Sequence, residues 1–197
     1  MDLLENTVHT DKHPIQSFIY EWIDAAVVSL IAVVFLFTFI FSIVGISGTS
    51  MLNTLQNNDI VILSRLFYEP KYGDIVVISR NYTNDEKMII DNENKPIIKR
   101  VIATEGQKVD IKNGKAWVDG VPLDEAAYTR TDTQITEDVK FPVTVPKGCI
   151  FVMGDNRADS HDSRSTEIGM VDKRFVLGEA IVRVFPFDQF KNLDTVK

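Results

Sequence analysis

The sequence predicts a mostly β fold: an antiparallel β-sheet domain preceded by one N-terminal transmembrane helix. The first observation behind this prediction is an uncharged, strongly apolar run over residues 25–44. The second is a series of short runs after it that are rich in Val, Ile and Phe and are separated by turn residues. The third is a composition of 45% hydrophobic and 25% charged residues in 197, which is typical of a chain with a folded core.

The apolar run predicts a retained membrane anchor. At about 1.5 Å per residue, a helix over residues 25–44 matches a bilayer core of roughly 30 Å. A cleaved signal peptide has a shorter apolar stretch behind a positive start, whereas residues 1–24 contain a single base, Lys12, among several acids. A core helix is rarely apolar on all faces. We therefore expect a tail over 1–24, a span over 25–44 and one domain over 45–197.

The sidedness of the predicted domain is not fixed by charge. The positive-inside rule has only Lys12 before the span, and the first base after it is Arg65. If the tail is cytoplasmic, residues 45–197 are extracytoplasmic, and a single cysteine then suits a bacterial cell surface better than a eukaryotic secreted domain.

The strand-like runs occupy most of the chain beyond the span. They are followed by turn signals, of which Asn113-Gly114 and Asp119-Gly120 favour positive φ in hairpins. The main runs are residues 59–66, 75–80, 97–103, 140–156 and 179–187. We expect little helix outside the membrane.

Composition also excludes several classes of protein. A net charge of -7 argues against nucleic-acid binding, because phosphate contacts need a basic surface. The single cysteine, Cys149, forms no intrachain disulfide and no Cys/His metal cluster. Of the three histidines, only His161 lies outside the polar N-terminal tail, so we expect no metal site.

One segment offers a candidate nucleophile and a second offers a candidate base. In GISGTSMLNTL (45–55), Ser50 is flanked by small residues that expose a hydroxyl and a backbone N–H, as acyl transfer requires, although such a segment is also typical of a juxtamembrane loop. In IIKRVIA (97–103), Lys99 lies among apolar residues, where loss of hydration lowers a lysine pKa. The alternative is an edge-strand lysine whose amine reaches water.

A third segment, GDNRADSHDSR (154–164), is polar and rich in turn residues. Asp162 and Arg164 are spaced to form an ion pair, and Ser160 offers a hydroxyl that can orient a neutral lysine. A solvated loop remains an alternative. A calcium loop is a weaker one, since the spacing lacks the glycine and terminal glutamate of an EF-hand.

In this order, the three segments resemble the type I signal peptidase family, membrane-bound serine proteases that remove signal peptides from exported proteins. GTSMLNTL resembles the family's serine motif, and KRVI at 99–102 resembles its lysine motif. GDNRADSHDSR matches the family's third motif at every fixed position, and the resemblance covers nearly the whole chain.

The resemblance implies a role for each matched residue. Ser50 is the nucleophile, Lys99 its general base, and Ser160 orients Lys99, while Asp162 and Arg164 form a supporting ion pair. The implied reaction proceeds through an acyl-enzyme and needs no metal or organic cofactor.

Two positions depart from the family pattern or vary within it. Asn53 stands where the family usually has proline, and asparagine does not fix φ as proline does. Gly48 stands where some members carry a serine that helps to bind the oxyanion; glycine here resembles the Gram-positive branch. Backbone amides near Gly48 and Ser50 are then the expected oxyanion donors.

The resemblance also implies the substrate and the location. We expect preproteins with A-x-A-like cleavage sites, read by a shallow apolar pocket. The pocket candidates by position are Ile46, Met51, Leu55 and Ile98. The expected location is the cell membrane, with a single span in the lipid bilayer and the catalytic domain on the extracytoplasmic side.

Three alternatives remain open on sequence grounds. One is a catalytically impaired family member that acts as an assembly or chaperone factor for surface proteins. A second is a Ser-Lys autoprotease of the transcriptional-repressor type, although a membrane segment stands where its DNA-binding module belongs. A third is a triad enzyme with His161 as base.

Overall fold

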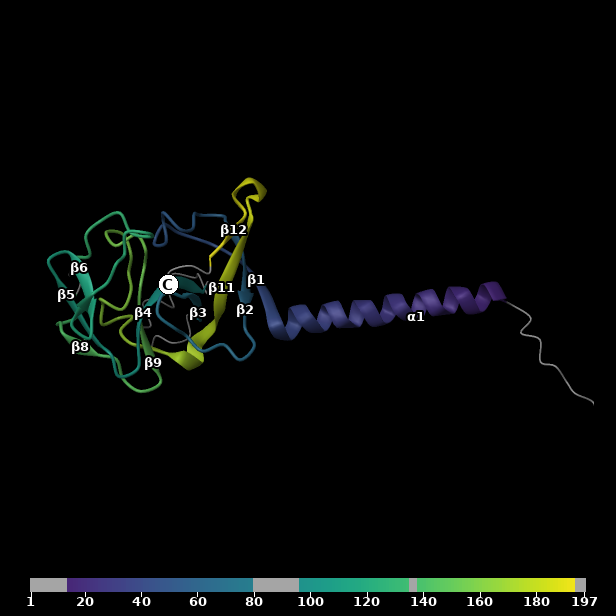
Figure 1. Cartoon of the computed structure of the whole chain (residues 1–197), viewed down its shortest axis with the longest axis horizontal. Coiled ribbons are helices and arrows are strands. Elements are labelled where there is room, and N and C mark those ends of the chain that lie inside the picture. Colours follow the sequence, from purple (N-terminus) through teal and green to yellow (C-terminus); the bar gives the residue numbers. More distant parts are fainter. Residues whose placement is uncertain (1–13, 80–95, 135–137, 194–197) are drawn as a thin grey trace, which may run out of the picture. The chain divides into compact units, whose positions relative to one another are not determined.

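The computed structural model describes residues 14–79, 96–134 and 138–193, which are coloured by sequence in Figure 1. Most of the predicted tail, residues 1–13, lies outside the described residues. The chain divides into two compact units, residues 1–39 and residues 40–197. Each unit is described by itself.

The first unit is dominated by one long helix. Helix α1 runs from Pro14 to Phe35 and continues as a π-helical turn over Leu36–Ile40. Proline suits the first turn of a helix, where its missing N–H needs no partner. Residues 17–40 form a helix of 24 residues with a mean hydropathy of 2.6, none of it buried, which is long and apolar enough to cross a membrane.

The predicted bounds of this helix, residues 25–44, are wrong at both ends. The helix begins at Pro14, well before residue 25, and Phe41–Gly45 form a strand, β1, rather than the last helical turn. The physical reason is that β1 finds a hydrogen-bonding partner in β2 (Ile60–Ser64), with Ile43 opposite Ile62. An uncharged run of Phe, Ile and Val is compatible with either structure, so tertiary pairing decides.

The second unit contains two antiparallel sheets. The larger follows the order β1-β2-β11-β3-β4-β9-β10, with β12 paired to β11. Its other strands are β3 (Ile75–Ile78), β4 (Ile97–Thr104), β9 (Cys149–Met153), β10 (Val171–Asp172), β11 (Val176–Phe185) and β12 (Lys191–Asn192). Two short 3-10 helices, Lys173–Phe175 and Phe187–Gln189, flank β11.

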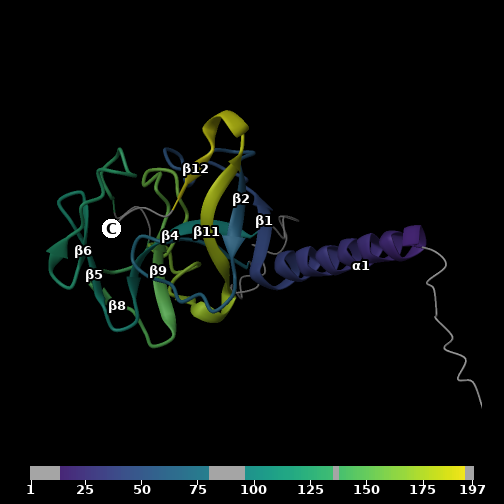
Figure 2. The same ribbon diagram turned by 45° about the vertical axis from the view of Figure 1, so that its right-hand side comes forward.

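The smaller sheet has the order β7-β6-β5-β8. It comprises β5 (Lys108–Lys112), β6 (Lys115–Val118), β7 (Val121–Pro122) and β8 (Val143–Thr144). Both predicted hairpin turns are confirmed, because Asn113, Gly114, Asp119 and Gly120 all have positive φ. Figures 1 and 2 place this sheet beside β4 and β9, away from β1.

The predicted fold class is therefore confirmed: a mostly antiparallel β domain with one N-terminal apolar helix. Apolar side chains from the large sheet and from the segment after β1 form one core cluster, which includes Met51, Leu55 and Ile98. A second cluster lies between β9 and the small sheet. Strand β4 is central to the large sheet, so a side chain on it is shielded from water.

Candidate active site

The segment that carries Ser50 is a tight turn anchored in the core. Hydrogen bonds from Leu52 N to Thr49 O (3.0 Å) and from Leu55 N to Met51 O (2.9 Å) close the turn. Met51 and Leu55 are buried in the cluster around β2 and β3. The two buried side chains thus hold the hydroxyl of Ser50 at the edge of the core.

Lys99 lies opposite this turn on β4. Its Nζ is 2.8 Å from Ser50 Oγ, and the residue is only 4% exposed. Burial lowers the pKa of Lys99 to about 8, with Arg164 acting in the same direction while Asp162 and Asp155 oppose the change. The structure thus brings the two predicted residues together, and the lowered pKa makes a neutral amine far more accessible near neutral pH than for an ordinary lysine.

The predicted ion pair between Asp162 and Arg164 is confirmed. Arg164 donates from Nε to Asp162 Oδ1 (2.8 Å) and from NH2 to Oδ2 (2.9 Å), and both side chains are fully buried. The Asp162 carboxylate also accepts from Gly154 N (3.0 Å). Burial acts to raise the pKa of Asp162, but the hydrogen bonds and charge of Arg164 outweigh it and hold that pKa below its usual value.

Ser160 lies beside the pair but not as predicted. Its Oγ is buried and makes no regular hydrogen bond to any residue that the structure describes, so the expected bond to Lys99 is not formed here. The hydroxyl instead lies near Asp162, whose pKa it helps to lower. It packs over Gly154, where an added Cβ would lie 2.2 Å from Ser160 Oγ. The role of Ser160 toward Lys99 stays a prediction.

Gly48 and Asn53 both adopt the left-handed region, with φ of +97° and +86°. The Gly48 N–H donates to Asn57 Oδ1 (3.1 Å), so this amide is already engaged. That the Ser50 N–H donates to the oxyanion stays a prediction. Asparagine tolerates positive φ, whereas proline is locked near -65°. The turn after Ser50 therefore has a backbone conformation at residue 53 that asparagine can adopt and proline cannot.

The four candidate pocket residues gather in one cluster beneath the Ser50 turn. Ile46, Met51, Leu55 and Ile98 are 5%, 1%, 0% and 7% exposed. Their near-complete burial means that they can meet a substrate only through small exposed patches. That they form the substrate pocket stays a prediction.

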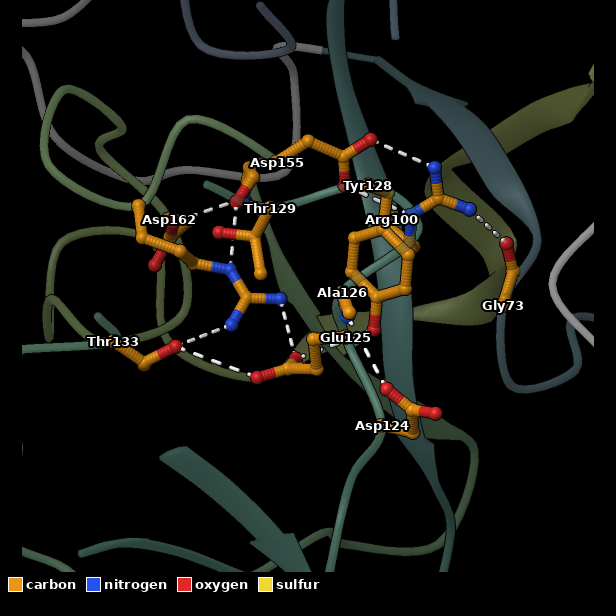
Figure 3. A network of polar contacts seen from close by, with 12 residues as sticks. Gly73, Arg100, Asp124, Glu125, Ala126, Tyr128, Thr129, Thr133, Asp155 and Asp162 are labelled. Atoms are coloured by element: carbon orange, nitrogen blue, oxygen red, sulfur yellow. Dashed lines mark hydrogen bonds and ion pairs between the residues drawn. The ribbon is translucent and has the colours of Figure 1, made fainter. Parts of the chain in front are cut away.

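A second buried ion pair was missed by the sequence interpretation. Arg100, next to Lys99 on β4, donates to both oxygens of Asp155 (2.8 and 2.7 Å) and to Gly73 O (2.6 Å). Figure 3 shows these contacts. Asp155 also accepts from the Thr54 hydroxyl, which ties β4 to the Ser50 turn. The sequence did hold a signal for this pair, because Arg100 shares a strand face with Ile98 and Ile102. A charged side chain on such an apolar face needs a buried partner.

A third pair joins Arg157 to Glu125, with NH2 2.6 Å from Oε1. Glu125, Tyr128 and Thr133 come from the segment between β7 and β8 and are all buried. No motif in that segment marked these residues, so sequence reasoning had no means of finding them.

His161, the alternative candidate base, lies beside an acidic side chain. Its Nε2 lies 3.0 Å from the Glu167 carboxylate, and its side chain is 40% exposed. The group within hydrogen-bond distance of Ser50 Oγ is the Lys99 amine. This geometry favours a Ser-Lys dyad over a histidine triad.

Comparison with known proteins decides the family. The family model described as "Signal peptidase, peptidase S26" matches residues 19–185. The chain belongs to the type I signal peptidase family. Signal peptidase I of Bacillus licheniformis is 31% identical over 186 residues, covering 89% of this chain and 94% of that protein. The probable signal peptidase I-1 of a Synechocystis strain is 34% identical over 181 residues, covering 89% and 87%.

A third relative, signal peptidase I P of Bacillus subtilis subsp. natto, is 31% identical and covers 90% of this chain and 95% of its own length. Most of the apolar helix and most of the β domain therefore lie inside the region that the family model matches. Family membership and the apolar helix together indicate a membrane-associated peptidase.

Proposed function

We propose that this chain is a serine endopeptidase that removes signal peptides from exported preproteins, with Ser50 as nucleophile and Lys99 as general base. The observation that carries the proposal is the 2.8 Å contact between Lys99 Nζ and Ser50 Oγ inside a buried setting. A lysine with a pKa of about 8 is about one-tenth neutral at pH 7, which is enough to supply a base.

The reaction follows from these two groups. Neutral Lys99 takes the hydroxyl proton as Ser50 Oγ bonds to the carbonyl carbon of the scissile peptide. The Ser50 N–H is placed to donate to the developing oxyanion. The lysine ammonium then passes its proton to the leaving amine as the peptide bond breaks, which leaves an acyl-enzyme on Ser50. A water molecule deprotonated by Lys99 hydrolyses that ester and restores the hydroxyl. The steps require no metal or organic cofactor.

The proposed substrate is a preprotein with small residues at an A-x-A-like site. The Ser50 turn begins soon after the candidate span, which ends at Ile40, and the strand between them is only five residues long. A peptide bond just outside the lipid bilayer is therefore within reach. We propose a single-pass protein of the cell membrane with its catalytic domain on the extracytoplasmic side.

Cleavage of such a preprotein by the full chain in detergent micelles tests the proposal. The variants are Ser50→Ala and Lys99→Ala, with His161→Ala as the matched control. We expect the wild type and His161→Ala to cleave after the small residue, and both dyad variants to lose about 10³-fold or more in rate.

Other outcomes would point elsewhere. Site-specific cleavage by either dyad variant would refute the Ser-Lys assignment, and loss of activity in His161→Ala would favour a histidine base. A wild-type chain that binds the preprotein without cleaving it would support the assembly or chaperone alternative.

A further inference from the structure

The ring of Tyr128 lies against two buried guanidinium groups. The Arg100 Cζ atom is 4.2 Å from the ring centroid, and the Arg157 Cζ atom is 5.8 Å from it. Tyr128 is 3% exposed, and both arginines are fully buried. Figure 3 shows the ring beside Arg100, on a segment separate from β4. A cation over an aromatic face is attracted most strongly where water is excluded, as it is here.

The two arginines hold adjacent residues of one corner. Arg100 binds the Asp155 carboxylate through two nitrogens, and Arg157 donates from Nε to Gly154 O (2.9 Å). Tyr128 thus lies against two of the side chains that hold the Gly154–Asp155 corner, which follows β9. The Arg100 guanidinium carbon lies over the Tyr128 ring, while the guanidinium nitrogens make the hydrogen bonds to Asp155 and Gly73.

The same corner is packed against the candidate catalytic groups. A Cβ on Gly154 would lie 2.4 Å from Ser50 O, and the next residue but one, Asn156, donates from its N–H to that oxygen (3.0 Å). Asp155 accepts from the Thr54 hydroxyl in the Ser50 turn. Any movement of the corner therefore moves the Ser50 turn relative to β4.

Tyr128 is itself held in place by polar contacts. Its hydroxyl donates to Glu125 Oε1 (3.2 Å), the same oxygen that accepts from Arg157 NH2 (2.6 Å). The Tyr72 hydroxyl lies 3.5 Å away. Burial and the nearby Glu125 raise the pKa of Tyr128, so the phenol stays neutral throughout the working range of pH.

We propose that Tyr128 is a positioning residue of the dyad: its ring holds Arg100 and Arg157, and through them the corner that sets the contact between Lys99 and Ser50. The inference rests on the proposed function. It assigns a role in catalysis to the segment between β7 and β8, which contains none of the family motifs.

The charges around Lys99 give this role a measurable signature. Asp155, Asp162 and Arg164 face Lys99 from the segment after β9, and Arg100 precedes the apolar remainder of β4. With the ring removed, the Arg100 guanidinium is less constrained and neutralises Asp155 less completely. Water also gains access to the buried pair. Both changes favour the ammonium form of Lys99, so its pKa rises.

The experiment is the pH profile of kcat/KM for the full chain in micelles. Tyr128→Leu removes the ring, Tyr128→Phe keeps it, and Phe151→Leu removes another fully buried ring, one that packs with apolar side chains of the small sheet. In the wild type we expect kcat/KM to rise with pH, and we call this rise the ascending limb. Tyr128→Leu should move the ascending limb to higher pH, lowering kcat/KM about tenfold at pH 7 and restoring it toward pH 9. Tyr128→Phe and Phe151→Leu should keep the wild-type limb.

If Tyr128→Leu does not fold, fluorinated phenylalanines at position 128 replace it. They preserve the ring's shape while weakening its negative face, so the limb should move upward as fluorines are added. An unshifted limb in Tyr128→Leu, or across the fluorinated series, would overturn the proposal. So would a Tyr128→Phe profile that is shifted as far as that of Tyr128→Leu, because the hydroxyl and not the ring would then matter.

These outcomes are separable from failure of the proposed function. If the wild type lacks an ascending limb, or if Lys99→Ala remains active, the dyad itself is refuted whatever the Tyr128 variants do.

Discussion

Gly154 lies so close to Ser50 that a Cβ atom on it would be 2.4 Å from the Ser50 carbonyl oxygen. The same Cβ would be 2.2 Å from Ser160 Oγ. The absence of a side chain at residue 154 therefore allows the Ser50 turn, the Ser160 hydroxyl and the end of β9 to meet.

Gly154→Ala should impair catalysis more than folding. The added methyl group displaces the Ser50 turn, and we expect kcat/KM to fall about 100-fold or more because small misplacements of reacting groups are costly. The matched control is Gly106→Ala. Gly106 has φ of +83° and open space around its Cβ, so its variant should lose about 1 kcal/mol of stability yet keep turnover. Equal activity in the two variants would contradict this account of the corner.

Asn53→Pro should damage the enzyme rather than improve it. The φ of +86° at Asn53 is inaccessible to proline, so the family residue would force the turn after Ser50 to rearrange. We expect a lower melting temperature and slower preprotein cleavage. Asn53→Gly, which tolerates the same φ, is the control and should retain both properties. A proline variant with wild-type activity would show that the turn adopts another conformation.

Lys99→Met should stabilise the protein near pH 7. The pKa of Lys99 falls from an ordinary value of 10.5 to about 8 on folding, so the unfolded chain binds more protons between these values. The cost of burying the ammonium is therefore fully present below about pH 8 and disappears as pH rises toward 10.5. Methionine fills the site without that cost, for a gain of about 1–3 kcal/mol at pH 7.

Urea denaturation at pH 7 and pH 9.5 measures this difference. The stability advantage of Lys99→Met should shrink as pH rises, because at pH 9.5 the folded wild-type lysine is neutral and the remaining cost is only that of deprotonating the unfolded lysine about one pH unit below its pKa. An advantage that is constant with pH would mean that Lys99 titrates normally in the folded protein.

The fold class could be predicted from sequence because the strand runs and two hairpin turns carried local signals. Asn113-Gly114 and Asp119-Gly120 adopt the predicted positive φ, and the β-branched runs form strands. The end of the apolar helix could not be predicted from sequence, since Phe41–Gly45 continues the uncharged apolar run of the helix before it. Its strand structure depends on pairing with Ile60–Ser64, which is a tertiary contact.

The residues of the candidate site likewise fall into those that could be predicted from sequence and those that could not. Ser50, Lys99, Asp162 and Arg164 lie in motifs and come together as predicted. The surroundings of Arg157 were not predictable, because Glu125 and Tyr128 belong to an irregular segment between β7 and β8. The bond expected from Ser160 to Lys99 is not formed, and the Ser160 hydroxyl packs over Gly154 instead.

The central claim is that Lys99 acts as a neutral base toward Ser50, and the pH dependence of wild-type kcat/KM on a preprotein in micelles tests it most directly. The rate should rise with the loss of one proton near pH 8, where burial sets the pKa of Lys99. A rate that is flat from pH 6 to 9, or a rise centred near 6.5 as for a histidine, would contradict it.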